Sequence, residues 1–239
     1  MSVYLVNKTL GQTPLERIEQ LRESKKISKS TPMTYAGRLD PAAEGKLIIL
    51  TEEDVLNKEK YTSLPKTYVV EILIGLQTDT GDLLGIPSEQ KSEIITKNNL
   101  LKILKKLSGI RTQKYHPYSS KNIKGVPLWK ITREKMNVEL PEHTIEIKNI
   151  KILSEKLIAY KKIFLRVNTI CKKVKGNFRQ KEILNSWKKI TGKEFQSFEL
   201  EINSSAGAYM RVLAEEIGEQ LGEKCTCFSI KRTKIKSFT

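Results

Sequence analysis

The amino-acid sequence predicts a single domain of the α+β class. Segments with the alternation typical of strands and segments with helical spacing follow one another without a regular strand–helix–strand rhythm. The 239 residues, of which 38% are hydrophobic, are enough for one large domain or two small ones. Because neither an internal repeat nor a low-complexity linker divides the chain, we expect one domain over residues 1–239.

The first helix is predicted by the capping signal at its N-terminus. Thr13 is the expected N-cap, Pro14 suits the first turn, and Glu16 completes a capping box. Apolar residues at helical spacing then mark one face of the helix: Leu15, Ile18 and Leu21. The polar stretch 22–32 follows as a solvated connector.

Strands and helices follow each other irregularly over the rest of the chain. The apolar run 47–50 and the run 66–76, which is rich in β-branched residues, predict two strands. Composition and spacing predict four more elements: a helix over 99–107 that ends near Gly109, strands over 157–168 and 197–203, and a helix over about 179–190. The last helix is expected to begin near Gly207 and to end at Gly222, since glycine favours the left-handed conformation that often ends a helix.

The positive charge of the chain points to nucleic acid as its partner. There are 43 Lys and Arg against 27 Asp and Glu, a formal net charge of +16. Residues 102–135 carry ten basic residues against one acid, residues 172–189 carry seven against one, and residues 224–239 carry five against none. Aromatic rings lie inside these segments: Tyr115, Tyr118, Trp129, Phe178, Trp187 and Phe228. Cations interleaved with rings suit phosphates and unstacked bases, although a lysine-rich composition with a solvated surface explains part of the excess.

Other classes of protein are disfavoured. No stretch of about 18 apolar residues is present, so we expect no membrane span, and the first residues lack the apolar core of a signal peptide, which favours a cytoplasmic protein. The three cysteines, Cys171, Cys225 and Cys227, are odd in number and poorly spaced for a disulfide framework. With only His116 and His143 beside them they make a weak metal site, so we expect no catalytic metal.

A short loop before the strand at 47–50 carries the strongest candidate for a reactive side chain. Gly37, Arg38, Asp40 and Pro41 place a carboxylate beside a flexible residue, a cation and a rigid residue. An Asp before Pro is by itself an ordinary turn former, because its carboxylate can hydrogen-bond the nearby backbone. The other motifs of the chain decide between a turn and a catalytic loop.

Five stretches of the chain match, in the right order, the motifs of one enzyme family. They are NKTLGQT at 7–13, AGRLDPAAEG at 36–45, KTY at 66–68 with GLQTDTGD at 75–82, SAGAYMR at 205–211 with LA at 213–214, and more weakly YSSK at 118–121 with GVPL at 125–128. Together these stretches resemble the TruB-type tRNA pseudouridine synthases. The resemblance covers most of the chain, from the N-terminal segment to the last predicted helix.

The resemblance implies a fold, an activity and a partner. The implied fold is a pseudouridine-synthase catalytic domain with a mixed, largely antiparallel sheet flanked by helices, a basic RNA-contacting insertion at about 111–140, and no separate PUA domain. The implied activity is that of an isomerase, a pseudouridine synthase that acts on uridine 55 in the T-arm stem-loop of tRNA without a cofactor. We expect the enzyme to be a monomer. Whether the basic stretch 171–190 takes over RNA contacts from the missing PUA domain stays open from the sequence.

The resemblance gives catalytic roles to three residues. Asp40 is the implied nucleophile, and Arg211 is its orienting partner, expected to keep the carboxylate charged through two-point pairing. Arg38 is a rival partner by sequence proximity, but it falls at a variable position of the motif. Tyr68 is implied to stack on the uracil and to help remove the proton from C5. Whether Asp40 attacks the sugar or the base, or first removes a ribose proton, stays open.

Further residues are implied to bind the substrate. Tyr209 and Ile230 are expected to be walls of the base pocket, and Lys8 to have a structural or RNA-facing role near it. Tyr35 stands where the bacterial family typically has a histidine, so its ring can stack on a base but cannot become a cation. The remaining members of the implied substrate-binding set are Gly37, Arg38 and Lys121.

Two other functions stay open from the sequence. One is a pseudouridine synthase for a different RNA stem-loop, because the sequence does not reveal which RNA is recognised. The other is a tRNA-binding or tRNA-folding protein whose catalysis is dispensable. The presence of Asp40, Tyr68 and Arg211 together favours an active enzyme.

Overall fold

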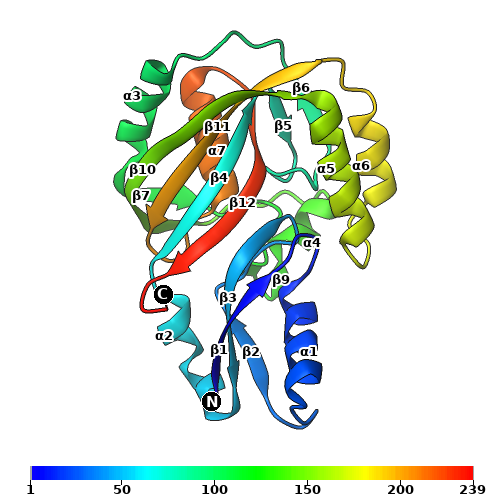
Figure 1. The fold of residues 1–239 in the computed structure, drawn as a ribbon, viewed down its shortest axis with the longest axis vertical. Helices are drawn as coiled ribbons and strands as arrows, with labels where there is room; N and C mark the ends of the chain where they lie inside the picture. The colour runs from blue at the N-terminus through cyan, green and yellow to red at the C-terminus, as the bar shows by residue number, and fades with distance from the viewer. Residues whose placement is uncertain (1, 239) are drawn as a thin grey trace.

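An eight-stranded mixed sheet forms the centre of the molecule in the computed structural model, which describes residues 2–238 (Figure 1). Its strands are β1 (Val3–Lys8), β2 (Met33–Ala36), β3 (Ala43–Thr51), β4 (Lys66–Ile74), β7 (Gly109–Lys114), β10 (Glu142–Ala159), β11 (Glu194–Ser204) and β12 (Cys225–Ile235). Two small sheets pair β5 (Leu76–Thr78) with β6 (Pro87–Glu89) and β8 (Asn122–Ile123) with β9 (Val126–Pro127). The helices are α1 (Pro14–Lys25), α2 (Lys58–Thr62), α3 (Lys97–Leu107), α4 (Leu128–Arg133), α5 (Tyr160–Lys173), α6 (Gln180–Trp187) and α7 (Met210–Leu221), with a 3₁₀ helix at Glu52–Asn57.

The strand order confirms the mixed, largely antiparallel sheet. From one edge to the other the order is β1-β3-β12-β4-β11-β10-β7, and β2 also pairs with β3. Strand β12 runs parallel to β3, and the other neighbours in this sheet are antiparallel. Residues 225–235 of the last basic segment therefore form an inner strand, in which Arg232 is 1% exposed, whereas Lys231 and Lys234 on the same strand are exposed.

Helices cover both faces of the larger part of the sheet. On one face α3 and α7 share a core with β4, in which Ile72, Leu104 and Leu213 are buried. On the other face α5 and α6 pack over Leu73 of β4, with Trp187 fully buried; Figure 1 shows these two helices together on the right. Neighbouring residues of β4 thus face different helix layers, which explains why the strand is a nearly continuous apolar run.

Helix α1 begins with the predicted capping box. The Thr13 hydroxyl accepts from the N–H of Glu16 (3.2 Å), and the Glu16 carboxylate accepts from the N–H of Thr13 (2.7 Å). Ile18 and Leu21 are buried beside β3, whereas Leu15 is 64% exposed, so the predicted apolar face was wrong at that position. The helix also extends into the first residues of the predicted connector.

The predicted strand over 157–168 is wrong, because most of this range lies in α5. Ile163, Val167 and Ile170 are buried at helical spacing in the cluster that α5 shares with α6. The β-branched residues that predicted a strand therefore serve as one face of an amphipathic helix. Burial of this face outweighs the weak intrinsic preference of such residues for strands.

The other predicted elements are confirmed to within a few residues. The helices over 99–107 and 179–190 correspond to α3 and α6, and the strands over 47–50, 66–76 and 197–203 correspond to β3, β4 and β11. Helix α7 begins later than predicted, at Met210, and ends at Gly222 with a φ of +71°. Within residues 2–238, every helix is too short or too polar to cross a membrane.

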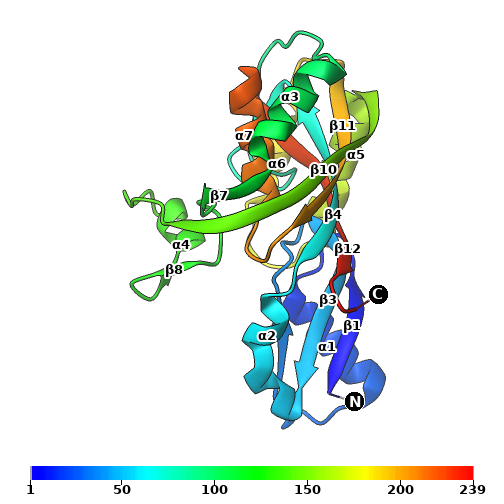
Figure 2. The ribbon, with the colours of Figure 1, turned by 90° about the vertical axis from the view of Figure 1, so that its left-hand side faces the viewer.

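The segment that follows β7 projects from the body of the molecule. Figure 2 shows β8 and α4 lying away from the sheet, next to the first part of β10, which pairs with β7. The small α4 buries Leu128 and Ile131 on one side. Three lysines of this arm are exposed: Lys121, Lys124 and Lys130. The arm lies within the range of about 111–140, for which contact with RNA stays a prediction.

Candidate active site

The loop between β2 and β3 carries Asp40 and is held from two sides. Arg232 of β12 donates from Nη2 to the carbonyl oxygen of Gly37 (2.9 Å), and the N–H of Gly11 donates to the carbonyl oxygen of Pro41 (2.8 Å). Gly37 has a φ of +73°, a left-handed conformation that glycine adopts at little cost. The Asp-Pro sequence is therefore part of a loop whose backbone is fixed by two other segments of the chain.

Lys8 holds the turn at 9–12, which itself contacts this loop, and it does not line the cavity beside Asp40. Its side chain is 1% exposed, and its Nζ donates to the carbonyl oxygen of Gln12 (2.7 Å). Burial lowers the pKa of Lys8 to about 8, an effect opposed by the negative charge of Asp40. Of its two implied roles, the structural one agrees with these contacts.

Arg211, in the first turn of α7, is the ion-pair partner of Asp40. Its Nη2 lies 2.8 Å from Oδ2 of Asp40, and its side chain is 4% exposed, against 30% for Asp40. Arg38, the rival by sequence proximity, instead donates from Nη2 to the hydroxyl of Tyr35 (2.9 Å). The fold thus brings the distant arginine to the carboxylate and turns the near one outward.

Backbone carbonyls hold the guanidinium of Arg211 in place. Nη1 donates to the carbonyl oxygen of Thr80 (2.6 Å), and Nη2 donates to that of Tyr118 (3.2 Å). Nε lies 3.8 Å from Oδ2 of Asp82. The contact with Asp40 joins one nitrogen to one oxygen, so the expected two-point pairing is not formed. These two carbonyl groups therefore constrain the orientation of the guanidinium.

A second carboxylate, Asp82, lies beneath this pair. Burial raises its pKa to about 6, with the charge of Arg211 acting in the opposite direction. Its Oδ1 accepts hydrogen bonds from the N–H of Leu84 (2.9 Å) and from the hydroxyl of Thr80 (3.1 Å). Asp82 closes the matched stretch 75–82 but had no predicted role. Arg211 therefore offsets two negative charges, one at the cavity and one in the interior.

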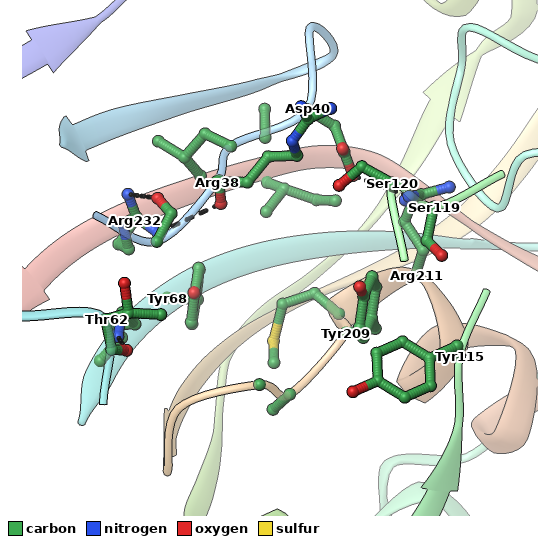
Figure 3. Close-up of a pocket in the computed structure, with 18 residues that line it drawn as sticks. Arg38, Asp40, Thr62, Tyr68, Tyr115, Ser119, Ser120, Tyr209, Arg211 and Arg232 are labelled. Atoms are coloured by element: carbon green, nitrogen blue, oxygen red, sulfur yellow. Dashed lines mark hydrogen bonds and ion pairs between the residues drawn. The ribbon is translucent and has the colours of Figure 1, made fainter. Parts of the chain in front are cut away.

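A cavity of about 240 Å³ lies in front of Asp40 (Figure 3). Asp40 and Arg211 lie on one side of it, and Tyr68, Tyr209 and Ile230 contribute from β4, the start of α7 and β12. Gly37 and Arg38 line it too. The volume falls below the roughly 300–1,000 Å³ of pockets for drug-sized ligands, so the cavity suits a smaller ligand.

Besides Lys8, two of the predicted substrate residues lie outside the cavity. Tyr35 accepts a hydrogen bond from Arg38, and Nζ of Lys58 lies 5.4 Å from the centre of its ring. Nζ of Lys121 lies 5.0 Å from the centre of the Tyr115 ring, which does line the cavity. Both residues therefore neighbour cavity-lining side chains, and their contact with substrate stays a prediction.

The cavity also contains residues without a role predicted from the sequence. They are Lys66, Tyr115, Ser119, Ser120 and Arg232, among others. Lys66 and the two serines fall inside matched stretches, so the motifs were an available signal for them. Arg232 and Tyr115 fall inside predicted basic segments, but no motif placed them at the cavity, because their contacts are made with segments far away in the chain. Burial lowers the pKa of Lys66 to about 8, and the charge of Arg232 adds to this effect.

Comparison with known families identifies the chain. Residues 25–175 match the model of the family described as TruB family pseudouridylate synthase (N terminal domain), which is more than half of the chain. The chain belongs to the TruB family. The matched range contains Asp40, Tyr68 and the projecting arm, whereas Arg211 lies beyond it.

Curated relatives of this TruB-family chain match it over nearly its whole length. It is 27% identical over 234 residues to the tRNA pseudouridine synthase B of Mycoplasma mobile, covering 98% of this chain and 68% of that protein. The protein of the same name from Aquifex aeolicus is 29% identical over 231 residues, with 97% and 67% covered, and that from Bacillus subtilis is 28% identical over 239 residues, with 99% and 66% covered. The chain therefore spans about two thirds of the length of these relatives.

Solved structures share the fold at lower sequence identity. A chain of a Cbf5-Nop10-Gar1 complex superimposes with a TM-score of 0.60 at 16% identity, covering 100% of this chain and 50% of that one. A chain of an H/ACA RNP bound to a substrate RNA containing 2′-deoxyuridine gives a TM-score of 0.57 at 15% identity, with 100% and 48% covered. At these identities the likeness concerns the fold, and it confirms the predicted fold class of this TruB-family chain.

Proposed function

We propose that this TruB-family protein is a tRNA pseudouridine synthase that converts uridine 55 of the T-arm stem-loop into pseudouridine. The names of the curated relatives support tRNA as the substrate. The single observation that carries the proposal is the ion pair between Asp40 and the buried Arg211 beside a cavity lined by aromatic rings. We also propose that the protein acts as a monomer, since the cavity is formed by one chain.

The reaction moves the ribose from one atom of uracil to another. The bond between C1′ of the ribose and N1 of the base breaks, the base turns, and a bond forms between C1′ and C5. The proton on C5 leaves, and N1 takes up a proton, so substrate and product contain the same atoms. Because nothing is oxidised or reduced, we expect the reaction to need no cofactor.

Asp40 is suited to this chemistry by its asymmetric pairing with Arg211. Arg211 is fixed by buried contacts, while the carboxylate of Asp40 is 30% exposed and lines the cavity. The contact with the guanidinium fixes the position of the carboxylate, and a positioned carboxylate can act as a nucleophile or a base. Asp40 therefore either attacks a carbon of the flipped nucleotide or removes a proton from its ribose.

The tyrosines of the cavity offer surfaces for the uracil. Tyr68 is 7% exposed on β4, and Tyr209 lies where α7 begins. Burial raises the pKa of Tyr209 to about 12, so its hydroxyl keeps its proton at neutral pH. A uracil inside a folded T-loop must be flipped out to reach Asp40, at a cost of roughly a few kcal/mol. Stacking on an aromatic ring contributes about 1–3 kcal/mol per base and offsets that cost.

The projecting arm and the basic stretch 171–190 are the proposed RNA contacts outside the cavity. Arg133 of the arm donates to the carbonyl oxygen of Asn177 (2.9 Å). Arg179 forms an ion pair with Asp79 (2.7 Å), and its guanidinium lies 4.9 Å from the centre of the Tyr118 ring. These contacts join the two basic segments, so that both can face the phosphates of one RNA, and phosphate contacts make binding strongly salt-dependent.

Asp40→Asn tests the proposal, because it keeps the size of the side chain and removes its charge. A tRNA transcript labelled with tritium at C5 of its uridines reports the reaction by releasing the label. We expect release to fall by at least roughly 1,000-fold, as for other essential nucleophiles, with little change in tRNA binding. Asp54→Asn is the matched control, since Asp54 lies in the 3₁₀ helix, outside the cavity, and contacts Ser2 and Asn57.

A comparable rate for Asp40→Asn contradicts the assignment of Asp40. The identity of the RNA is checked separately, by mapping pseudouridine in total RNA from cells with and without the gene. Loss of the modification at position 55 of tRNA is the expected result. Loss at another RNA stem-loop instead supports the alternative substrate, and no loss in any RNA supports a binding protein.

A further inference from the structure

His116 and Glu215 extend the chain of contacts that begins at Asp40 and Arg211. Nη1 of Arg211 lies 3.0 Å from Nδ1 of His116, and Nε2 of His116 lies 3.3 Å from Oε1 of Glu215. His116 is 1% exposed and comes from the segment after β7, whereas Glu215 lies one turn beyond Arg211 on α7. None of the roles described above uses either residue.

The hydrogen-bond partners of His116 determine which of its nitrogens carries the hydrogen. Nδ1 faces two donors, the Nη1 of Arg211 and the N–H of Tyr118 at 3.0 Å. Because both of these groups can only donate, Nδ1 must be an acceptor. Burial lowers the pKa of His116 well below its usual range, and the charge of Arg211 adds to this effect. The ring is therefore neutral, its hydrogen is on Nε2, and Nε2 donates to Glu215.

The packing around His116 and Glu215 leaves no room for a side chain at Gly81. Gly81 has a φ of +70°, and a Cβ there would lie 2.9 Å from Cβ of Arg211, 3.0 Å from Oε1 of Glu215 and 3.2 Å from Nε2 of His116. A residue with a side chain at this position would therefore push the three groups apart. The glycine in the turn after β5 is thus needed for the close approach of this turn to the arginine and its partners.

We propose that His116, held in one tautomer by Glu215, is a positioning residue that keeps the guanidinium of Arg211 in the orientation that pairs with Asp40. This inference rests on the proposed function, in which Asp40 acts while paired with Arg211. Nη1 has two hydrogens, of which one is directed to the carbonyl oxygen of Thr80 and the other to His116. Without the acceptor on His116, one buried hydrogen of Arg211 is unpaired and the plane of the guanidinium loses one of its constraints.

A histidine that only fills space needs no acceptor at Nδ1, so the test separates shape from hydrogen bonding. The contact from the N–H of Tyr118 to the side chain at 116 spans two residues, as in an Asx turn. His116→Asn therefore keeps an acceptor oxygen near the position of Nδ1. His116→Gln carries the same amide one carbon further out, and His116→Leu has no acceptor.

Single-turnover rates at saturating tRNA and the Kd for tRNA are measured for the wild type and the three variants. We expect His116→Leu and His116→Gln to react roughly 10- to 100-fold more slowly, with unchanged Kd, because a hydrogen bond to a charged group is lost. His116→Asn is expected to stay within about three-fold of the wild type.

Equal rates for the Asn and Gln variants, or a wild-type rate for the Leu variant, overturn the proposal. The comparison of Asn with Gln still decides the matter when the Leu variant does not fold, since both are polar amides. A wild-type protein without activity on tRNA overturns the proposed function instead, so the two failures are distinguishable.

Discussion

Replacing Arg211 with lysine keeps the positive charge of the site and removes its geometry. The guanidinium contacts two carboxylates, two carbonyl oxygens and Nδ1 of His116. A lysine has one nitrogen with three hydrogens, so it cannot serve all of these groups from one position. We therefore expect Asp40 to keep a cation nearby but to lose its fixed orientation.

The contacts of Arg211 set the size of the effect. An ammonium leaves at least two of the acceptors without a donor, and each unpaired buried acceptor costs about 1–3 kcal/mol. Arg211→Lys is then expected to lower the free energy of unfolding by about 2–6 kcal/mol. If the variant also loses about 3 kcal/mol of the stabilisation that these contacts give to the transition state, the rate of the chemical step falls by roughly 100-fold.

Single-turnover release of tritium at saturating tRNA measures the chemical step, and urea unfolding measures the stability. Arg166→Lys is the matched control, because Arg166 on α5 is also partly buried and donates to the backbone carbonyl of Phe228 (3.0 Å), outside the cavity. The control is expected to keep the wild-type rate. An Arg211→Lys enzyme with the stability and rate of the wild type would refute the reasoning from geometry.

The projecting arm, two tyrosines and the buried Asp82 give three more expectations. Replacing three lysines of the arm with neutral residues is expected to weaken tRNA binding, while the rate at saturating tRNA stays unchanged. The slope of the logarithm of the binding constant against the logarithm of the salt concentration is expected to decrease in size by roughly 0.7–0.9 for each phosphate that is no longer bound. An unchanged slope assigns the lysines to ordinary surface. These lysines are Lys121, Lys124 and Lys130. Tyr35→Ala is expected to raise the tRNA concentration needed for half-maximal rate more than it slows the reaction of the bound complex, whereas Tyr68→Ala is expected to abolish turnover. Single-turnover assays on an isolated T-arm stem-loop distinguish the two effects. A Tyr35→Ala enzyme without activity places Tyr35 in the chemical site. Burial raises the pKa of Asp82 to about 6, so the folded state binds the proton of this carboxyl group more tightly than the unfolded chain does. The stabilisation that results is present at low pH and is lost as the pH rises through about 6. The stability of the wild type minus that of Asp82→Asn is thus expected to fall by about 2–3 kcal/mol from about pH 4 to about pH 7 in urea unfolding, and a difference independent of pH contradicts the burial argument.

Local signals in the sequence predicted the elements whose stability is decided locally. The capping box of α1 depends on hydrogen bonds between Thr13 and Glu16, and the end of α7 depends on the left-handed conformation of Gly222. The strand over 157–168 was predicted wrongly because its prediction also rested on local signals alone. Its β-branched residues favour a strand locally, but their spacing lets α5 bury one face against α6, which only the tertiary structure brings within reach.

The sequence by itself determined the charge, the class of fold, the loop that carries Asp40 and the motifs that indicate a family. It did not determine which groups meet at that loop. Arg38 is near Asp40 in the chain but bonds Tyr35, while Arg211 arrives from α7 and pairs with the carboxylate. Likewise, the sequence did not show that the last basic segment forms an inner strand, which buries Arg232 and leaves Lys231 exposed.

Tertiary structure alone decided the surroundings of Arg211. Thr80, His116 and Glu215 come from three separate segments, and each contact depends on how the sheet and α7 are packed. Hydrogen bonds and ion pairs act over a few ångströms, so they depend on distances in space. Sequence patterns report the neighbours along the chain, and the distance between remote residues is set only when the core between them has formed.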